Sequence, residues 1–93
     1  MKKGEYKIPG GKLVRIEVET KGQKLEAIEI TGDFFLHPES SLEQIELQLI
    51  GTPLGVKDLE RKIKDVLKQF QAQLLGVNPR QLAECIMSTV QGK

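Results

Sequence analysis

The most glycine-rich stretch of the sequence is the segment 9–12, Pro-Gly-Gly-Lys, in which two glycines are followed directly by a cation. Paired glycines let the backbone approach a phosphate closely, and the ammonium group of Lys12 could pair with its charge. The segment is not a P-loop, because the G-x-x-x-x-G-K-[ST] spacing is absent. A glycine pair is also typical of a hairpin turn between two strands, and spacing alone leaves both interpretations open.

A second segment, residues 32–38, reads Gly-Asp-Phe-Phe-Leu-His-Pro and carries a carboxylate and an imidazole. Asp33 and His37 stand four residues apart, so a pair in which the carboxylate orients the ring for proton transfer is one hypothesis. Such a pair needs a third group and a pocket. The alternative is that Asp33 caps a turn and His37 lies at the entrance of a helix.

Phe34 and Phe35 are consecutive aromatic residues in the same segment. Alternation along an extended chain turns only some of these side chains inward, so one ring is expected to face solvent and to mark a partner site. The alternative is that the loop curls under and both rings enter the core.

Cys85 and His37 are the only cysteine and the only histidine. They cannot form a structural zinc site unless carboxylates supply the other ligands. No neighbouring residue marks Cys85 as an activated thiolate, so we expect it to be a core residue of a helix. A single cysteine excludes an internal disulfide and fits a reducing compartment.

Strands are expected in the first third of the chain, where hydrophobic residues alternate with polar ones over 5–8, 12–20 and 24–31. Turns at 9–11 and 21–23 would join them into an antiparallel meander, with Gly22 supplying a positive φ. We expect Leu25, Ala27 and Glu29 to point outward. The side chains expected to point inward are Tyr6, Ile8, Val14, Ile16, Val18, Ile28 and Ile30.

Helices are expected in the remainder. The first places Pro38 in its first turn and ends at Gly51, and the second covers 56–75 with Gly76 as its cap. The third opens with Asn78 as N-cap and Pro79 at its first position. The expected core residues are Leu42, Ile45, Leu49, Val56, Leu59, Ile63, Val66, Phe70, Leu74, Leu82, Ile86 and Val90. Residues 1–93 therefore predict one α+β domain of two layers, a three-stranded antiparallel sheet covered on one face by three helices in the order β-β-β-α-α-α.

The composition limits the classes of partner. The 14 basic and 13 acidic residues leave a net charge of +1, and three Phe, one Tyr and no Trp provide few stacking surfaces. Nucleic-acid binding is therefore not expected. No 18 apolar residues run together and no apolar segment follows the basic N-terminus, so we expect a cytoplasmic protein with no membrane partner.

Two segments taken together, YKIPGGKLV at 6–14 and ITGDFF at 30–35, resemble the small C-terminal domain of lipoate–protein ligases. In that family a PGGKLV strand opening and a GDFF strand ending frame a two-stranded hairpin that helices follow. The resemblance covers nearly the whole chain, and the pair of motifs is more specific than either motif alone.

The resemblance implies a protein without its own active site. In many bacterial ligases this domain is fused behind a catalytic domain, and a sequence in which Met1 opens directly onto the domain fits the stand-alone form. The implied function is that of a non-catalytic accessory subunit. It would form a heterodimer with a catalytic ligase chain and be required for ATP-dependent activation of lipoate to lipoyl-AMP.

The implied ligands belong to the assembled ligase. No cofactor is expected on this chain alone, whereas the assembly uses ATP, Mg and lipoate, and a lipoyl-acceptor protein is an indirect partner. We expect this chain to cover the nucleotide site and to exclude water from a labile acyl-adenylate. No catalytic or metal-binding residue is expected, and Lys12 is the expected phosphate neighbour. The residues expected to face the partner or the adenylate are Gly10, Gly11, Lys12, Gly32, Asp33, Phe34, Phe35 and His37.

Two alternatives stay open. The order β-β-β-α-α-α also resembles the scaffold of SufE and IscU-type sulfur and iron–sulfur assembly proteins. Those proteins carry a reactive cysteine in the loop after the last strand, where this chain has Gly32 and Asp33, so sulfur transfer would depend on Cys85. The other alternative is a generic protein-binding module.

Overall fold

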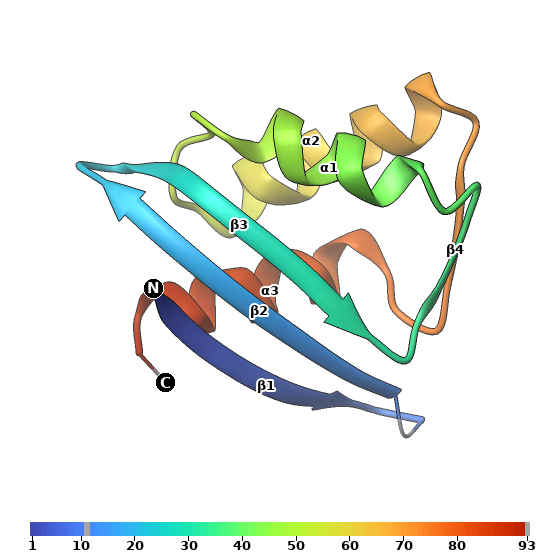
Figure 1. Cartoon of the computed structure of the whole chain (residues 1–93), viewed down its shortest axis with the longest axis horizontal. Helices are drawn as coiled ribbons and strands as arrows, with labels where there is room; N and C mark the ends of the chain where they lie inside the picture. Colours follow the sequence, from blue (N-terminus) through green and yellow to red (C-terminus); the bar gives the residue numbers. More distant parts are fainter. Residues whose placement is uncertain (11, 93) are drawn as a thin grey trace.

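The computed structural model describes residues 1–10 and 12–92, and the described residues form two small sheets and three helices (Figure 1). β1, β2 and β3 make an antiparallel meander, and β4 and β5 pair as a separate antiparallel sheet. The α+β class, the three-stranded sheet and the three helices are therefore as predicted. The elements are β1 (Lys2–Ile8), β2 (Lys12–Lys21), β3 (Lys24–Gly32), β4 (Phe35–His37), α1 (Ser41–Leu49), α2 (Val56–Gln69), β5 (Gln73–Leu75) and α3 (Pro79–Val90).

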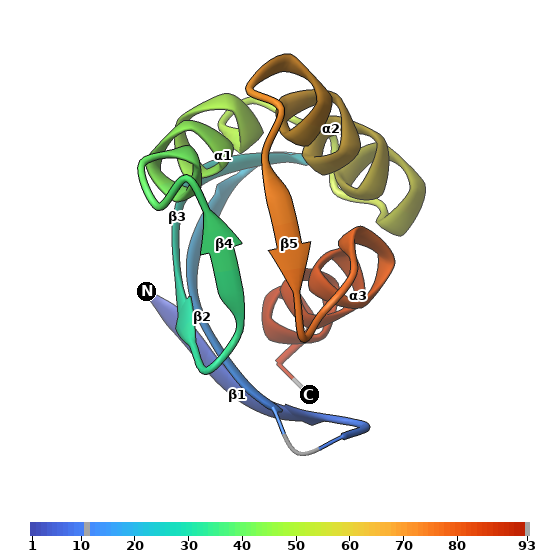
Figure 2. The same ribbon diagram turned by 90° about the vertical axis from the view of Figure 1, so that its right-hand side faces the viewer.

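One face of the large sheet forms the core with the helices. The central strand β2 places Val14, Ile16 and Val18 on that face, and all three are fully buried. α1 packs on β3, α3 packs on β1 and β2, and α2 packs on α1 and α3. The sheet curves around this core (Figure 2). The core includes hydrophobic side chains that alternate with polar ones along the strands and point to the inner face.

The prediction that Leu25 points outward is wrong, because β3 contains a bulge. Glu19 pairs with Ala27 and Thr20 pairs with Leu25, which leaves Glu26 without an opposite residue. An extra residue reverses the alternation beyond it. Leu25 therefore joins Ile28 on the inner face and is 1% exposed.

The prediction that the second helix reaches Leu75 is also wrong. α2 ends at Gln69, Phe70 is its C-cap, and Gln71 has a positive φ of 50°. The chain then enters β5, so Leu74 belongs to a strand rather than to the apolar stripe of a helix. The pairing of β5 with β4 replaces the last turns of that helix.

The start of α1 also differs from the prediction. α1 begins at Ser41, whereas Pro38 lies before the helix in a turn that the Ser41 N–H closes on the Pro38 carbonyl at 3.0 Å. The reason is that β4 extends as far as His37, so the chain must turn before the helix. With β4 and β5 the order becomes β-β-β-β-α-α-β-α, in which two short strands are added to the predicted order β-β-β-α-α-α.

The start of α3 is as predicted. The Asn78 side chain accepts a hydrogen bond of 2.8 Å from the Gln81 N–H, and the Gln81 side chain accepts one of 3.0 Å from the Asn78 N–H. This reciprocal arrangement is a capping box, with Pro79 at the first helical position. It fixes the direction in which the chain leaves the loop after β5.

Candidate functional site

The two motif segments meet at one end of the large sheet. Val14 pairs with Gly32, and the Asp33 N–H donates a hydrogen bond of 2.9 Å to the Leu13 carbonyl. Figure 2 looks onto this end, where β4 and β5 lie in front and the adjoining ends of β1 and β2 lie below them. The geometry therefore joins the ends of two segments that lie some twenty positions apart in the sequence.

Gly32 has a structural reason to be glycine. Its φ of +154° lies in the region that L side chains rarely adopt, and a Cβ added there would overlap the Leu13 carbonyl oxygen. Gly10 also has a positive φ, of +103°, but no atom lies near the position of its missing Cβ. Gly11, the remaining predicted glycine of the site, lies outside the described residues.

Lys12 reaches the loop between β5 and α3. A Cβ added at Gly76 would lie 3.3 Å from the Lys12 Cγ and 3.4 Å from its Cε, so the aliphatic part of the lysine lies against Gly76. Lys12 is exposed, and no carboxylate of the described residues forms an ion pair with it. Its ammonium group is therefore a cation open to a partner at this end.

Of the two consecutive phenylalanines, Phe35 faces solvent, as predicted for one of them. It is 56% exposed and lies on β4 opposite Leu75, which is 50% exposed. Phe34 is partly buried and packs against the core, and Leu36 is buried. The alternative in which both rings enter the core is wrong, and the outer face of the β4–β5 sheet carries a cross-strand apolar pair.

Asp33 and His37 do not form a catalytic pair. Both are exposed, at the two ends of the segment that contains β4, and His37 lies opposite Gln73. Within the part of the chain that the structure describes, the two side chains share neither an ion pair nor a hydrogen bond. Asp33 lies in the bend between β3 and β4. His37 is the last residue of β4, four positions before the first residue of α1, so it does not lie at the helix entrance.

An open groove of about 400 Å³ lies between the end of β3, the segment leading into β4, and the start of α1. Glu39 is the one charged residue among its lining side chains, and the others are mostly hydrophobic. A carboxylate without a cation does not suit a phosphate. The groove therefore fits a protein segment better than a nucleotide. Its lining residues are Ile30, Thr31, Gly32, Phe34, Phe35, Leu36, Glu39 and Leu42.

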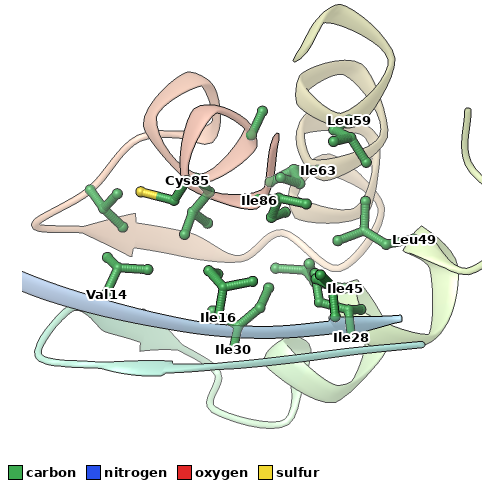
Figure 3. Close-up of a cluster of buried hydrophobic side chains, with 14 of the residues drawn as sticks. Val14, Ile16, Ile28, Ile30, Ile45, Leu49, Leu59, Ile63, Cys85 and Ile86 are labelled. Atoms are coloured by element: carbon green, nitrogen blue, oxygen red, sulfur yellow. The ribbon is translucent and has the colours of Figure 1, made fainter. Parts of the chain in front are cut away.

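Cys85 faces the core from α3, as predicted (Figure 3). Burial, with a smaller effect of the neighbouring Glu84 carboxylate, raises the pKa of its thiol to about 11. The thiol is therefore protonated at neutral pH and not a nucleophile. Its own carbonyl accepts a hydrogen bond of 2.9 Å from the Thr89 hydroxyl, which lies 2.9 Å from the Tyr6 hydroxyl. This arrangement ties α3 to β1 and is structural.

Sequence reasoning missed Leu75 and Gly76 as parts of this site, because both were assigned to the end of a helix. One signal could have indicated otherwise. The charged residues of α2 stop at Lys68, and the seven residues 69–75 carry no charge. No described helix is long and apolar enough to cross a membrane, and no group of three or more His, Cys, Asp or Glu in the described residues could hold a metal ion.

Comparison with known proteins identifies the family of this chain. A family model described as the bacterial lipoate protein ligase C-terminus matches residues 2–86. Among curated proteins, lipoate-protein ligase A subunit 2 of Thermoplasma acidophilum is 30% identical over 77 residues, which are 80% of this chain and 76% of the relative.

A solved structure agrees with this assignment. This structure comes from an archaeal lipoylation system, a bi-partite lipoate protein ligase and its E2 lipoyl domain from Thermoplasma acidophilum. The match has a TM-score of 0.72 and 25% sequence identity, and it covers 90% of this chain and 96% of that chain. The chain therefore belongs to the family of lipoate–protein ligase C-terminal domains.

Proposed function

We propose that this chain is the accessory subunit of a bipartite lipoate–protein ligase and acts as a heterodimer with a separate catalytic chain. The observation that carries the proposal is the exposed pair of Phe35 and Leu75 at the end of the sheet where the two motif segments meet. Large exposed apolar side chains grouped beside polar ones mark protein–protein contacts. The relative that is named as subunit 2 of a ligase supports a partner of that kind.

The chemistry of lipoate activation belongs to the catalytic chain. That chain would hold ATP, Mg and lipoate and transfer the lipoyl group to an acceptor protein. In this chain the thiol of Cys85 is buried and protonated, and Asp33 and His37 stand apart. These features favour a non-catalytic role. Because the partner uses ATP, we place the assembly in the cytoplasm.

The role of this chain is to close the nucleotide site of its partner. Phe35 and Leu75 provide the apolar contact, and Lys12, carried against Gly76, brings a cation toward the phosphate of the acyl-adenylate. Exclusion of water protects a labile acyl-adenylate and strengthens charge interactions inside the closed site. The chain therefore contributes an apolar surface and the Lys12 ammonium group to one side of the partner's site, and it provides no binding pocket of its own.

Reconstitution tests the proposal. The catalytic chain is incubated with lipoate and Mg-ATP, with and without this protein, and lipoyl-AMP is followed over time. We expect adenylate formation to depend on both chains and to saturate at equimolar amounts. Adenylation that proceeds undiminished without this chain would reject the accessory role.

A further inference from the structure

We propose that the open end of strand β3, together with the groove beside it, binds an extended, positively charged segment of the catalytic ligase chain as an added strand. The inference rests on the accessory function proposed above and names the surface and the kind of segment that form the heterodimer. Four observations carry it: the free strand edge, its partial cover, the adjoining groove and the charge around them.

β3 is an edge strand, since the sheet order is β1-β2-β3. The Asp33 N–H bonds to the Leu13 carbonyl on β2, and backbone groups alternate in direction along an antiparallel strand. The N–H and C=O groups of Ile28, Ile30 and Gly32 therefore point away from β2, toward the free edge. A row of backbone groups that no neighbouring strand pairs is a template for another strand.

The beginning of this edge is already covered by the loop between α1 and α2. The Gly51 N–H donates to the Leu25 carbonyl at 2.7 Å, and the Leu25 N–H donates to the Thr52 carbonyl at 3.0 Å. The Leu54 N–H donates to the Gln23 carbonyl at 2.9 Å. The chain thus protects the first part of its own edge, and the part from Ile28 to Gly32 is left open.

A side chain occupies the middle of the open part. The Ile30 N–H donates a hydrogen bond of 2.8 Å to Glu46 Oε2 of α1, and no other edge group from Ile28 to Gly32 has a partner among the described residues. A carboxylate on a flexible side chain satisfies this donor in the free chain. A carbonyl of an added strand can take its place, which releases the carboxylate to pair with a cation.

The groove of about 400 Å³ adjoins the same edge. Ile30, Thr31 and Gly32 form one wall, and Leu42, one turn before Glu46 on α1, lies on the other. In strand addition, backbone hydrogen bonds provide affinity while alternate side chains enter pockets beside the edge. The exposed ring of Phe35 lines the groove and continues it toward the β4–β5 sheet.

The charge around the groove identifies the occupant as basic. Glu39 lines it, Glu46 lies on its edge, and Glu29 and Glu43 are near enough to raise the pKa of the partly buried Glu46 carboxyl. No lysine or arginine lines the groove. Pairing of two β3 edges from two copies of this chain would bring these carboxylates together, so a second copy is disfavoured, and a segment with Lys or Arg complements them.

Hydrogen exchange of the complete chain tests the proposal, free and bound to the catalytic chain. We expect the amides of Ile28 and Gly32 to exchange at least about tenfold more slowly in the complex, because they gain hydrogen bonds. The double variant Glu39→Lys/Glu43→Lys should weaken the complex about tenfold or more. The single change Asp65→Lys reverses one charge at an exposed position of α2 outside the groove and should leave affinity within about twofold.

Three results would overturn the proposal. If a functional complex forms while the Ile28 and Gly32 amides exchange as in the free chain, strand addition is wrong and the accessory function stands. If these amides become protected in a concentration-dependent dimer of this chain alone, the occupant is a second copy. If no complex with the catalytic chain forms and adenylation is independent of this protein, the accessory function fails as well.

Discussion

The N–H of Asp33 donates a 2.9 Å hydrogen bond to the carbonyl of Leu13, and this bond closes the sheet at the point where the two motif segments meet. Gly32, beside it, lets the two strands approach this closely. The chain then leaves the sheet and enters β4, where Phe35 pairs with Leu75. The glycine and aspartate of the motif therefore set the direction of the chain, and the exposed residues after them are those that we propose to contact the catalytic chain.

Replacement of Gly32 by alanine tests this junction. The Cβ would overlap the Leu13 carbonyl at a φ of +154°, so we expect Gly32→Ala to lower the free energy of unfolding by roughly 2–3 kcal/mol. Gly10→Ala is the matched control, because Gly10 also has a positive φ but no atom near its missing Cβ. We expect it to cost about 1 kcal/mol. Urea unfolding measures both, and equal losses would show that the contact with Leu13 is unimportant.

Truncation of Phe35 tests the docking role of the β4–β5 sheet. Phe35→Ala removes a ring that is 56% exposed, so we expect the stability of the free chain to change little and the affinity for the catalytic chain to fall about tenfold or more. Leu47→Ala is the matched control, since Leu47 is also 56% exposed but lies on α1. Calorimetric titration measures the affinities. Equal losses for the two variants would contradict a docking role that is specific to Phe35.

Much of the fold could be predicted because local patterns determine it. The alternation of Val14, Ile16 and Val18 with charged residues fixes which face of β2 is buried, and Asn78 with Pro79 fixes the start of α3. The bulge that buries Leu25 could not be predicted in this way. It depends on pairing between β2 and β3, because the preference of either strand alone does not reveal an extra residue.

The site could be predicted only in part, for the same reason. The meander explains why the segments around Lys12 and Gly32 meet, since both lie at turns on the same end of the sheet. The contributions of Leu75 and Gly76 depend on the contact of β5 with β4, which are separated by two helices. An apolar run such as Leu74–Leu75 fits either a helix or a strand, and tertiary pairing decides between them.

The burial of the Cys85 thiol in the core can be tested through the pH dependence of stability. Burial raises the pKa of the thiol from 9.0 to about 11, so the unfolded chain loses this proton at a lower pH than the folded chain does. Its contribution to stability is therefore complete below pH 9.0 and is lost as the pH rises toward about 11. Urea unfolding over this range should show a steeper loss for the wild type than for Cys85→Ala.

The same residue separates the ligase function from sulfur transfer. Cys85→Ala should retain full support of adenylation, and the wild-type thiol should react with an aromatic disulfide reagent only after unfolding. Rapid reaction in the native chain, or loss of function in the alanine variant at unchanged stability, would contradict a purely structural cysteine.

Glu46 provides the corresponding test at low pH. Partial burial raises the pKa of its carboxyl, aided by Glu29 and Glu43, and the hydrogen bond from the Ile30 N–H opposes this shift. The folded chain therefore binds this proton more tightly than the unfolded chain, and the associated stability is present below pH 4.5 and is lost as the pH rises through the folded value. The ionised carboxylate present at higher pH is therefore stabilised less by folding than the protonated form is.

A glutamine at this position stays neutral and still offers an oxygen to the Ile30 N–H. We therefore expect Glu46→Gln to be more stable than the wild type at about pH 7, with a difference that shrinks as the pH falls toward about 4. Asp65→Asn, at an exposed site on α2, controls for removal of a negative charge. Urea unfolding across this range measures the difference. A variant less stable than the wild type at neutral pH would show that the charged hydrogen bond outweighs burial.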